Sequence, residues 1–218
     1  MKKIIVVLFI ASFYQLIPAQ DKGRYWEDIQ TIKKYEKMYA PAANPIIFVG
    51  SSSIRRWDDL ERTFAAYRAI NRGIGGAVIN EITYYLDDLV FQYHPRQIVI
   101  YAGENDLGDK ASTPDSIYNR TQRLITAIRA QMPVVPIVYV SIKPSPVRDK
   151  VMDKAIDANK QIRIYLLQQK NIQYVDVFSL MLSADKKSRP ELFLPDMLHM
   201  NPKGYKIWTK AIQPYLIK

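Results

Sequence analysis

The strongest constraint on the fold is a series of five short apolar runs, separated by segments whose apolar residues recur at helical spacing. Short runs that are apolar throughout are typical of strands buried on both faces. Strands that alternate with helices pair in parallel, and the helices cover both faces of the sheet. We therefore predict a three-layer α/β/α, flavodoxin-like fold with a five-stranded parallel sheet. The predicted strands are residues 46–49, 69–71, 98–101, 136–142 and 172–177.

Helices are predicted wherever apolar residues mark one face of a segment. Thr113 followed by Pro114, and Asn201 followed by Pro202, are typical helix starts because proline suits the first helical position. The first predicted helix covers residues 24–40. Three more have their apolar faces within residues 79–90, 117–128 and 155–166. In the last helix Trp208, Ala211, Ile212 and Tyr215 are expected to face inward. Residues 58–67 are expected to be helical or irregular, and residues 178–198 to form a long surface connection.

The first 19 residues are expected to be a secretory signal peptide rather than part of this fold. A basic start at Lys2 and Lys3 precedes the apolar run 4–11, and Pro18-Ala19-Gln20 offers a small-residue cleavage site. The apolar run is too short to span a bilayer. We predict cleavage after Ala19, a periplasmic or secreted location without stable membrane insertion, and a single domain over residues 20–218.

The charge and cysteine content exclude some classes of partner and site. The formal net charge is +10, and the basic residues occur in pairs, such as Arg55-Arg56, rather than in one long block. This distribution is compatible with acidic partners, but it lacks the basic face interleaved with aromatics that nucleic-acid binding needs. The chain contains no cysteine, so disulfides and thiolate metal sites are excluded. We predict no nucleic-acid partner.

Small and amide residues follow three of the predicted strands, at the edge where functional groups of an open parallel sheet gather. They are Gly50-Ser51-Ser52-Ser53, Gly73 to Gly76, and Gly103-Glu104-Asn105-Asp106. A strand that stops at glycine and turns into a helix presents a small nucleophile beside unpaired backbone N–H groups. Glycine turns and an asparagine amide can hold a developing oxyanion. Each turn alone is more typical of an ordinary loop, with serines as caps in the first, and it is their coincidence at one edge that favours a functional site.

Two histidines are available as a general base. His94 enters the third strand from its amino end, roughly 16 Å from the functional edge at ~3.3 Å per residue. His199 follows the last strand, three residues after Asp196, whose carboxylate can accept from Nδ1–H and leave Nε2 for a nucleophile. The alternative is a local Asp–His hydrogen bond in a solvated loop. A zinc site is not predicted, because one histidine and scattered carboxylates do not form a recognisable ligand set.

Taken in order, four blocks of the chain resemble the SGNH hydrolase superfamily, the GDSL-type esterases and lipases. They are Phe48-Val49-Gly50-Ser51-Ser52-Ser53-Ile54, Asn71-Arg72-Gly73-Ile74-Gly75-Gly76, Gly103-Glu104-Asn105-Asp106 and Asp196-Met197-Leu198-His199. The resemblance runs from residue 48 to about residue 205. Most of these blocks are weak evidence when taken alone. The G-x-N-D block after a buried strand is moderately specific for the family, and the ordered set of four blocks is strongly specific.

The resemblance implies a serine esterase that needs no metal or organic cofactor. It assigns Ser52 as the nucleophile, His199 as the general base and Asp196 as the residue that orients the base. The implied oxyanion hole comprises Ser52, Gly76 and Asn105. Two positions depart from the family pattern, because Ser51 and Ala77 stand where an aspartate is usual. Ser51 remains the second candidate for the nucleophile, since chemistry alone does not distinguish serines within a run.

Several substrates are compatible with these residues. Export and the compact length favour a carbohydrate esterase that removes acetyl groups from a glycan, with a small-molecule or glycan ester as the partner. The same residues would serve a lysophospholipase or a thioesterase. A non-catalytic relative that binds glycans or lipids is the remaining alternative, supported by Ser51 in place of aspartate.

Overall fold

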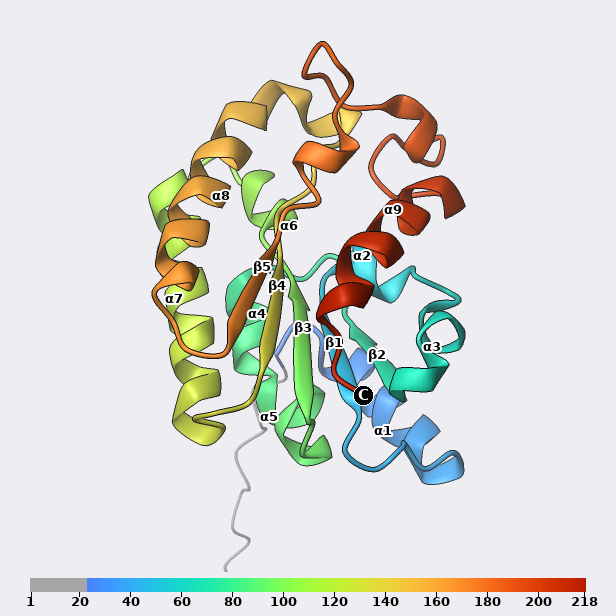
Figure 1. The fold of residues 1–218 in the computed structure, drawn as a ribbon. Helices are drawn as coiled ribbons and strands as arrows, with labels where there is room; N and C mark the ends of the chain where they lie inside the picture. Colours follow the sequence, from blue (N-terminus) through green and yellow to red (C-terminus); the bar gives the residue numbers. More distant parts are fainter. Residues whose placement is uncertain (1–22) are drawn as a thin grey trace, which may run out of the picture.

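The computed structural model describes residues 23–218, and within them five parallel strands form one sheet in the order β2-β1-β3-β4-β5 (Figure 1). This order is that of a flavodoxin-like doubly wound sheet, and it confirms the predicted fold. The strands are β1 (Ile46–Gly50), β2 (Ala69–Gly73), β3 (Gln97–Tyr101), β4 (Ile137–Val140) and β5 (Ile172–Val175). The expected signal peptide, residues 1–19, lies outside the described residues.

The sheet separates two hydrophobic cores, because successive residues of a strand point to opposite faces. Ile47 and Val49 of β1 belong to one core, and Ile46 and Phe48 to the other. Figure 1 shows α4, α7 and α8 on one side of the sheet and α2, α3 and α9 on the other. The first core is covered by α1 (Trp26–Met38), α4 (Ile79–Tyr84), α5 (Leu86–Leu89), α7 (Pro114–Gln131) and α8 (Met152–Leu167), and the second by α2 (Ser52–Arg55), α3 (Leu60–Thr63) and α9 (Pro202–Ile212).

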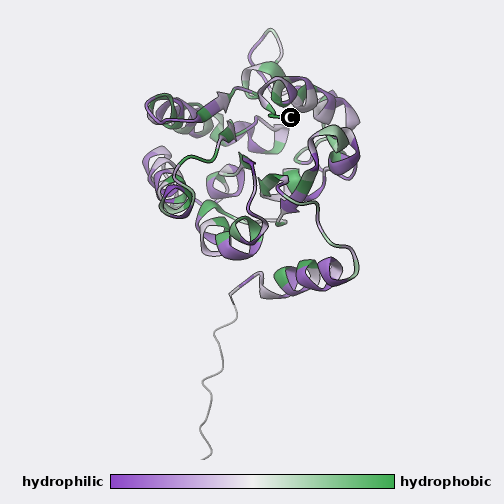
Figure 2. Ribbon diagram, turned by 60° about the horizontal axis from the view of Figure 1, so that its bottom comes forward, coloured by the Kyte–Doolittle hydropathy of each residue, from purple (hydrophilic) through white to green (hydrophobic). Residues whose placement is uncertain are grey.

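Helix caps explain why two of the predicted helices begin where they do. The Thr113 hydroxyl accepts a hydrogen bond from the Ser116 N–H at 3.1 Å, and α7 starts at Pro114. The side-chain oxygen of Asn201 accepts from the Lys203 N–H at 2.9 Å, and α9 starts at Pro202. Figure 2 shows hydrophilic and hydrophobic residues alternating along the helices, as expected when one face packs on a sheet. None of the helices in residues 23–218 is long and apolar enough to span a bilayer.

The segment 178–198 is more than the surface connection that the sequence predicts. Met181, Leu192 and Phe193 within it are 0%, 2% and 6% exposed and belong to the second core. An isolated antiparallel bridge joins Phe193 to Met200. These apolar side chains do not recur at helical or strand spacing, so hydrophobic periodicity could not predict their burial. The segment closes one end of the core instead of lying outside it.

Two further expectations about helices are wrong in detail. The predicted continuous helix over residues 79–90 is divided into α4 and α5 at Tyr85, although its apolar residues are buried as expected. Tyr215 was expected to point inward but is 42% exposed, because α9 ends at Ile212 and a short 3₁₀ turn follows. Trp208 and Ile212, which lie within α9, are fully buried as predicted.

The register of the strands brings three loops to one edge of the sheet. Gly50 at the end of β1 pairs with Gly73 on one side and with Tyr101 on the other. A Cβ atom at Gly50 would lie 1.9 Å from the Tyr101 carbonyl oxygen, so only glycine allows this close approach. The turns that follow β1, β2 and β3 therefore emerge side by side.

Candidate active site

Ser52 is the first residue of α2, and only Ser51 separates it from the end of β1. Its hydroxyl oxygen lies 3.0 Å from His199 Nε2, although the two residues are 147 positions apart in the chain. Because Ser52 opens the helix, no carbonyl of α2 can accept its backbone N–H. The position thus combines a hydroxyl in contact with an imidazole and a backbone donor next to it.

The loop that carries His199 also fixes the orientation of its ring. The Asp196 carboxylate lies 2.7 Å from His199 Nδ1, and its other oxygen accepts from the backbone N–H groups of Leu198 and His199 at 3.0 and 2.9 Å. Although desolvation opposes the effect, these hydrogen bonds from His199 and Leu198 hold the pKa of Asp196 well below its usual range. Asp196 is therefore a carboxylate, which requires the proton of the ring to sit on Nδ1 and leaves Nε2 as an acceptor toward Ser52.

Helix α9 anchors this arrangement to the turn between β1 and α2. The Tyr205 hydroxyl donates to the Ser53 carbonyl at 3.0 Å, next to Ser52. The Tyr205 ring stacks on Trp57 with centroids 4.9 Å apart, and Trp208 packs edge-on against Trp57 at 6.0 Å. The large apolar area buried by these rings couples the docking of α9 to the position of the α2 turn.

The structure distinguishes Ser52, which the resemblance assigned as the nucleophile, from Ser51, the second candidate. Ser51 is 1% exposed, and its hydroxyl oxygen has no hydrogen-bond partner within residues 23–218. Ser52 is partly exposed and contacts the imidazole. A reacting serine needs access to both substrate and base, so the geometry favours Ser52.

The turn after β2 carries Gly76 and is held against the Ser52 turn. The Ile74 N–H donates to the Gly50 carbonyl at 2.8 Å, and Gly76 has a φ of +80°, a conformation that favours glycine. The Asn105 amide donates to the Ala77 carbonyl at 3.0 Å, so the side chain of Asn105 lies beside this turn. One Nδ2 proton of Asn105 is used in this bond, and the amide has a second. Gly76 and Asn105 are thus brought together as predicted from the strand ends.

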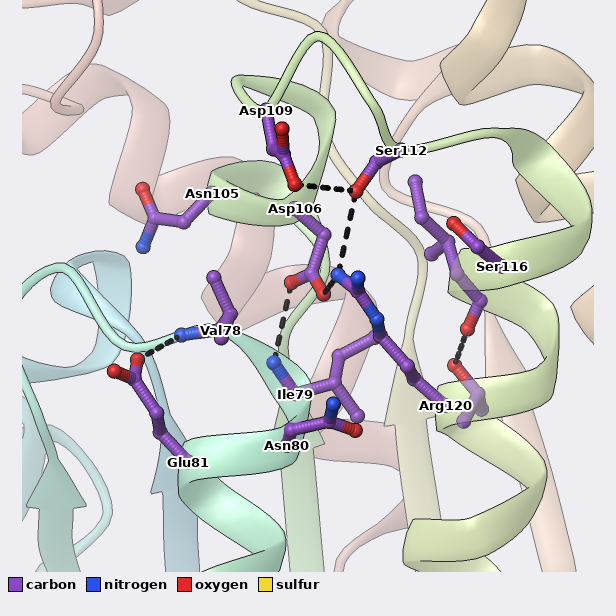
Figure 3. A network of polar contacts seen from close by, with 12 residues as sticks. Val78, Ile79, Asn80, Glu81, Asn105, Asp106, Asp109, Ser112, Ser116 and Arg120 are labelled. Carbon is purple, nitrogen blue, oxygen red and sulfur yellow. Dashed lines mark hydrogen bonds and ion pairs between the residues drawn. The ribbon is translucent and has the colours of Figure 1, made fainter. Parts of the chain in front are cut away.

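A buried aspartate links the segments that carry Gly76 and Asn105 (Figure 3). Asp106 is 0% exposed, and one of its oxygens accepts from the Ile79 N–H at 3.1 Å while the other accepts from Arg120 Nη1 at 2.7 Å. Burial raises the pKa of Asp106, and the hydrogen bonds from Arg120 and Ile79 counteract that rise. Arg120 in turn lies 3.3 Å from the Ser112 hydroxyl. The carboxylate therefore ties α6 (Glu104–Leu107) to the start of α4 and to α7.

His94, which the sequence analysis set aside, lies where it was expected. It is exposed and precedes the amino end of β3, the opposite end from Ser52. Within residues 23–218 no cluster of three or more histidine or carboxylate side chains is placed to bind a metal ion.

Sequence reasoning missed the buried charges around the site. Asp106 was visible as the last residue of the G-x-N-D block, but its contacts with α4 and α7 are long-range and leave no local pattern. Lys143 and Glu104 form a salt bridge of 2.7 Å with side chains 0% and 3% exposed. The available signal was a lysine directly after an apolar strand, at Ile142-Lys143, where a solvated residue would be the ordinary interpretation.

Comparisons with known proteins agree with this architecture. The sequence profile of the GDSL-like Lipase/Acylhydrolase family matches residues 46–207. No curated protein matches the chain. Among solved structures, a GDSL-like lipase from Bacteroides thetaiotaomicron has a TM-score of 0.74 at 20% identity, covering 87% of this chain and 97% of that one.

Two other solved structures are similar at lower identity. A member of the lipolytic protein G-D-S-L family from Veillonella parvula has a TM-score of 0.64 at 17% identity and covers 78% of this chain and 96% of its own. A variant of Axe2, an acetyl xylan esterase from Geobacillus stearothermophilus, has a TM-score of 0.64 at 15% identity and covers 81% and 95%. The profile match over most of the described residues, on the fold that these structures share, shows that the chain belongs to the GDSL-like lipase/acylhydrolase family of SGNH hydrolases and is a hydrolase of carboxylic esters.

Proposed function

We propose that the protein is an exported serine esterase that uses Ser52, His199 and Asp196 as its triad and removes acetyl groups from a carbohydrate. The observation that carries the proposal is the hydrogen-bonded series from Asp196 through His199 to Ser52 Oγ, with spacings of 2.7 and 3.0 Å. A base, a nucleophile and a residue that orients the base are the three parts that such a mechanism requires.

The proposed reaction proceeds in two steps. Ser52 Oγ attacks the ester carbonyl while His199 Nε2 takes its proton, and the imidazolium then gives that proton to the leaving alcohol. In the second step His199 takes a proton from water, which attacks the acyl carbonyl. The bond to Ser52 Oγ then breaks, the imidazolium returns its proton to Ser52 Oγ, and the acid leaves. The backbone N–H groups of Ser52 and Gly76 and the Asn105 amide stabilise the oxyanion formed in each step. Asp196 stays ionised throughout and stabilises the imidazolium.

Replacement of the nucleophile tests this assignment. Ser52→Ala removes the attacking oxygen, and we expect its hydrolysis of a short p-nitrophenyl ester to fall to the background rate. The matched control is Ser51→Ala, which removes the buried neighbouring hydroxyl and should retain turnover. Labelling by a fluorophosphonate probe should be lost in Ser52→Ala and kept in Ser51→Ala. Retained hydrolysis by Ser52→Ala would show that the nucleophile is another residue.

One comparison supports an acetylated carbohydrate as the substrate, because the Axe2 neighbour is an acetyl xylan esterase on the same fold. A cavity of about 850 Å³ lies beside the site, where Arg56 is 3.9 Å from Asp196. Its lining includes basic (Arg62, Lys206), acidic (Asp58, Asp59) and apolar or aromatic side chains (Trp57, Leu194, Met200, Tyr205).

A substrate panel separates this assignment from its alternatives. Acetylated xylo-oligosaccharides, short p-nitrophenyl acyl esters, lysophospholipids and acyl thioesters are compared by kcat/KM. We expect the acetylated saccharides to be preferred over lysolipids and thioesters. A preference for long acyl chains would favour a lysophospholipase or thioesterase, and binding of glycans or lipids without turnover would favour a non-catalytic relative. Mass spectrometry of the mature amino terminus tests export, with cleavage after Ala19 expected.

A further inference from the structure

Lys143 is a buried cation that the proposed reaction does not use. It follows β4, its side chain is 0% exposed, and its Nζ donates to Glu104 Oε1 at 2.7 Å. Burial lowers the pKa of Lys143, and the charge of Glu104 opposes that lowering. Taking two charges out of water is costly, and their attraction offsets that cost only when the geometry is good and the remaining donors and acceptors are used.

The partners of this ion pair come from both sides of the candidate active site. Glu104 directly precedes Asn105, and its carboxylate also accepts from the Tyr101 hydroxyl at 2.9 Å and from the Ser145 hydroxyl at 3.1 Å. Lys143 Nζ donates a second hydrogen bond, of 2.7 Å, to the carbonyl of Leu198, the residue directly before His199. The ion pair thus joins the segment that carries Asn105 to the loop that carries the histidine.

The histidine loop has a backbone that benefits from external support. Met197 has a φ of +55°, a conformation that side-chain-bearing residues adopt at an energetic cost. Asp196 caps the loop from within. Two hydrogen bonds reach its backbone from the segment after β4, namely Lys143 Nζ to the Leu198 carbonyl and the Val147 N–H to the Met197 carbonyl at 3.3 Å.

We propose that Lys143 is a positioning residue, which holds the Leu198 carbonyl and thereby sets the position of His199 relative to Ser52, with Glu104 as its counter-ion. Well-packed apolar residues of similar volume often match a buried ion pair in stability, so stability alone does not explain the charges. A hydrogen bond is directional and fixes the carbonyl it meets, whereas apolar contacts tolerate sliding. This inference rests on the proposed function, because it assigns His199 the role of base.

The test uses a double variant, Lys143→Met/Glu104→Gln, in the full chain. It removes both charges, so that no unpaired ion is left buried, and it keeps the side-chain lengths. The Tyr101 and Ser145 hydroxyls bond different oxygens of Glu104, so the glutamine oxygen accepts from one of them and the other can accept from the glutamine NH2 group. We expect kcat for a p-nitrophenyl ester to fall by roughly 10- to 100-fold, because displacements of about 1 Å in a catalytic group can cost up to about 10²-fold. KM should stay within about twofold, since the substrate contacts are unchanged.

A spectroscopic measurement reports the position of the imidazole without turnover. The chain has two histidines, so the exposed His94→Gln background leaves one imidazole to observe by NMR. In that background we expect a downfield proton resonance from the His199 Nδ1–H bonded to Asp196. The resonance should shift or broaden in Lys143→Met/Glu104→Gln. A purely structural role would leave both kcat and this resonance unchanged in the folded protein.

The matched control is Arg129→Met. Arg129 is also a cation that donates to loop carbonyls, those of Val135 at 2.7 Å and Lys170 at 3.0 Å, but it lies near the opposite end of the sheet. The control variant should lower stability and leave kcat and the resonance unchanged. Wild-type kcat in the double variant would overturn the inference. A double variant that does not fold would also overturn it, because the pair would then be a requirement of the fold. If the wild type neither hydrolyses esters nor reacts with fluorophosphonate, the proposed function fails, and the resonance still tests the position of His199.

Discussion

Replacement of Asp106 by alanine should reveal how far the turn that carries Gly76, a proposed oxyanion-hole residue, depends on one buried carboxylate. Asp106 accepts hydrogen bonds from the Ile79 N–H and from Arg120, and it is fully buried. Alanine removes both acceptors at once. The Ile79 N–H is then buried without a partner, and Arg120, whose side chain is 22% exposed, loses its counter-ion.

The size of the effect follows from these contacts. An unsatisfied buried donor costs about 1–3 kcal/mol, and removal of one partner of a fully buried ion pair costs about 3–5 kcal/mol. Because Arg120 can reach solvent, we discount the second figure and expect Asp106→Ala to lower the free energy of unfolding by roughly 3 kcal/mol. Asp106→Asn keeps an acceptor for one of the two donors and should cost about 1–2 kcal/mol.

The free energy of unfolding of both variants is measured by urea denaturation monitored by circular dichroism. The control is Asp109→Asn, at an exposed neighbouring position, whose free energy of unfolding should stay within about 0.5 kcal/mol of the wild type. Hydrolysis of a p-nitrophenyl ester by the folded fraction should fall by about 10²-fold in Asp106→Ala, because the turn carrying Gly76 loses the Ile79–Asp106 hydrogen bond and keeps only the Asn105–Ala77 bond to α6. If Asp106→Ala matched the Asp109→Asn control in stability, the carboxylate would not connect these segments, and the reasoning would be refuted.

Three further changes test separate parts of the structure. Asn105→Ala removes a proposed oxyanion donor and should lower kcat by ~10²–10³-fold with little change in KM, measured by steady-state hydrolysis; an unchanged kcat would exclude the amide from the oxyanion hole. Asp196→Asn should lower kcat by up to roughly 10⁴-fold at neutral pH, since the imidazole loses the carboxylate that fixes its tautomer. The folded-state pKa of Asp196 lies below its ordinary value of 3.8. The ionised carboxylate therefore stabilises the fold above that pH, and this stabilisation is lost as the pH falls below it. In thermal denaturation, the melting temperature of Asp196→Asn should fall less on acidification than that of the wild type. Gly50→Ala would place a methyl group 1.9 Å from the Tyr101 carbonyl oxygen and should abolish folding, which the yield of soluble protein measures, whereas the open position Gly75 should accept alanine.

Much of the fold could be predicted because its signals are local. Runs such as residues 98–101 contain enough apolar residues in sequence to identify a buried strand, and Thr113-Pro114 and Asn201-Pro202 specify helix starts through their own side chains. The order of the strands follows from the general behaviour of alternating strands and helices. By contrast, Phe193 is buried in a core assembled from distant segments, and the spacing of apolar residues within 178–198 does not predict that burial.

Some features of the candidate site could be predicted from the sequence, and others could not. The proximity of Ser52, Gly76 and Asn105 follows from the rule that parallel strands end at one edge, and the exclusion of His94 follows from distance along a strand. The resemblance assigned Ser52 and kept Ser51 as the second candidate; a choice on chemical grounds needed coordinates, because it depends on which hydroxyl lies against the imidazole. The Lys143–Glu104 pair was equally inaccessible, since 39 residues separate the two ions and only burial distinguishes Lys143 from a surface lysine.

The 147-residue separation of Ser52 and His199 has a consequence for the proposed triad. A chain truncated after β5 would contain Ser52 and all five strands but would lack the proposed base. Tyr205 and Trp208, which pack on Trp57, hold the segment that follows the histidine against the α2 turn. Under the proposed mechanism, a protease cut between β5 and His199 that releases α9 should therefore abolish ester turnover even though every strand lies in the remaining fragment.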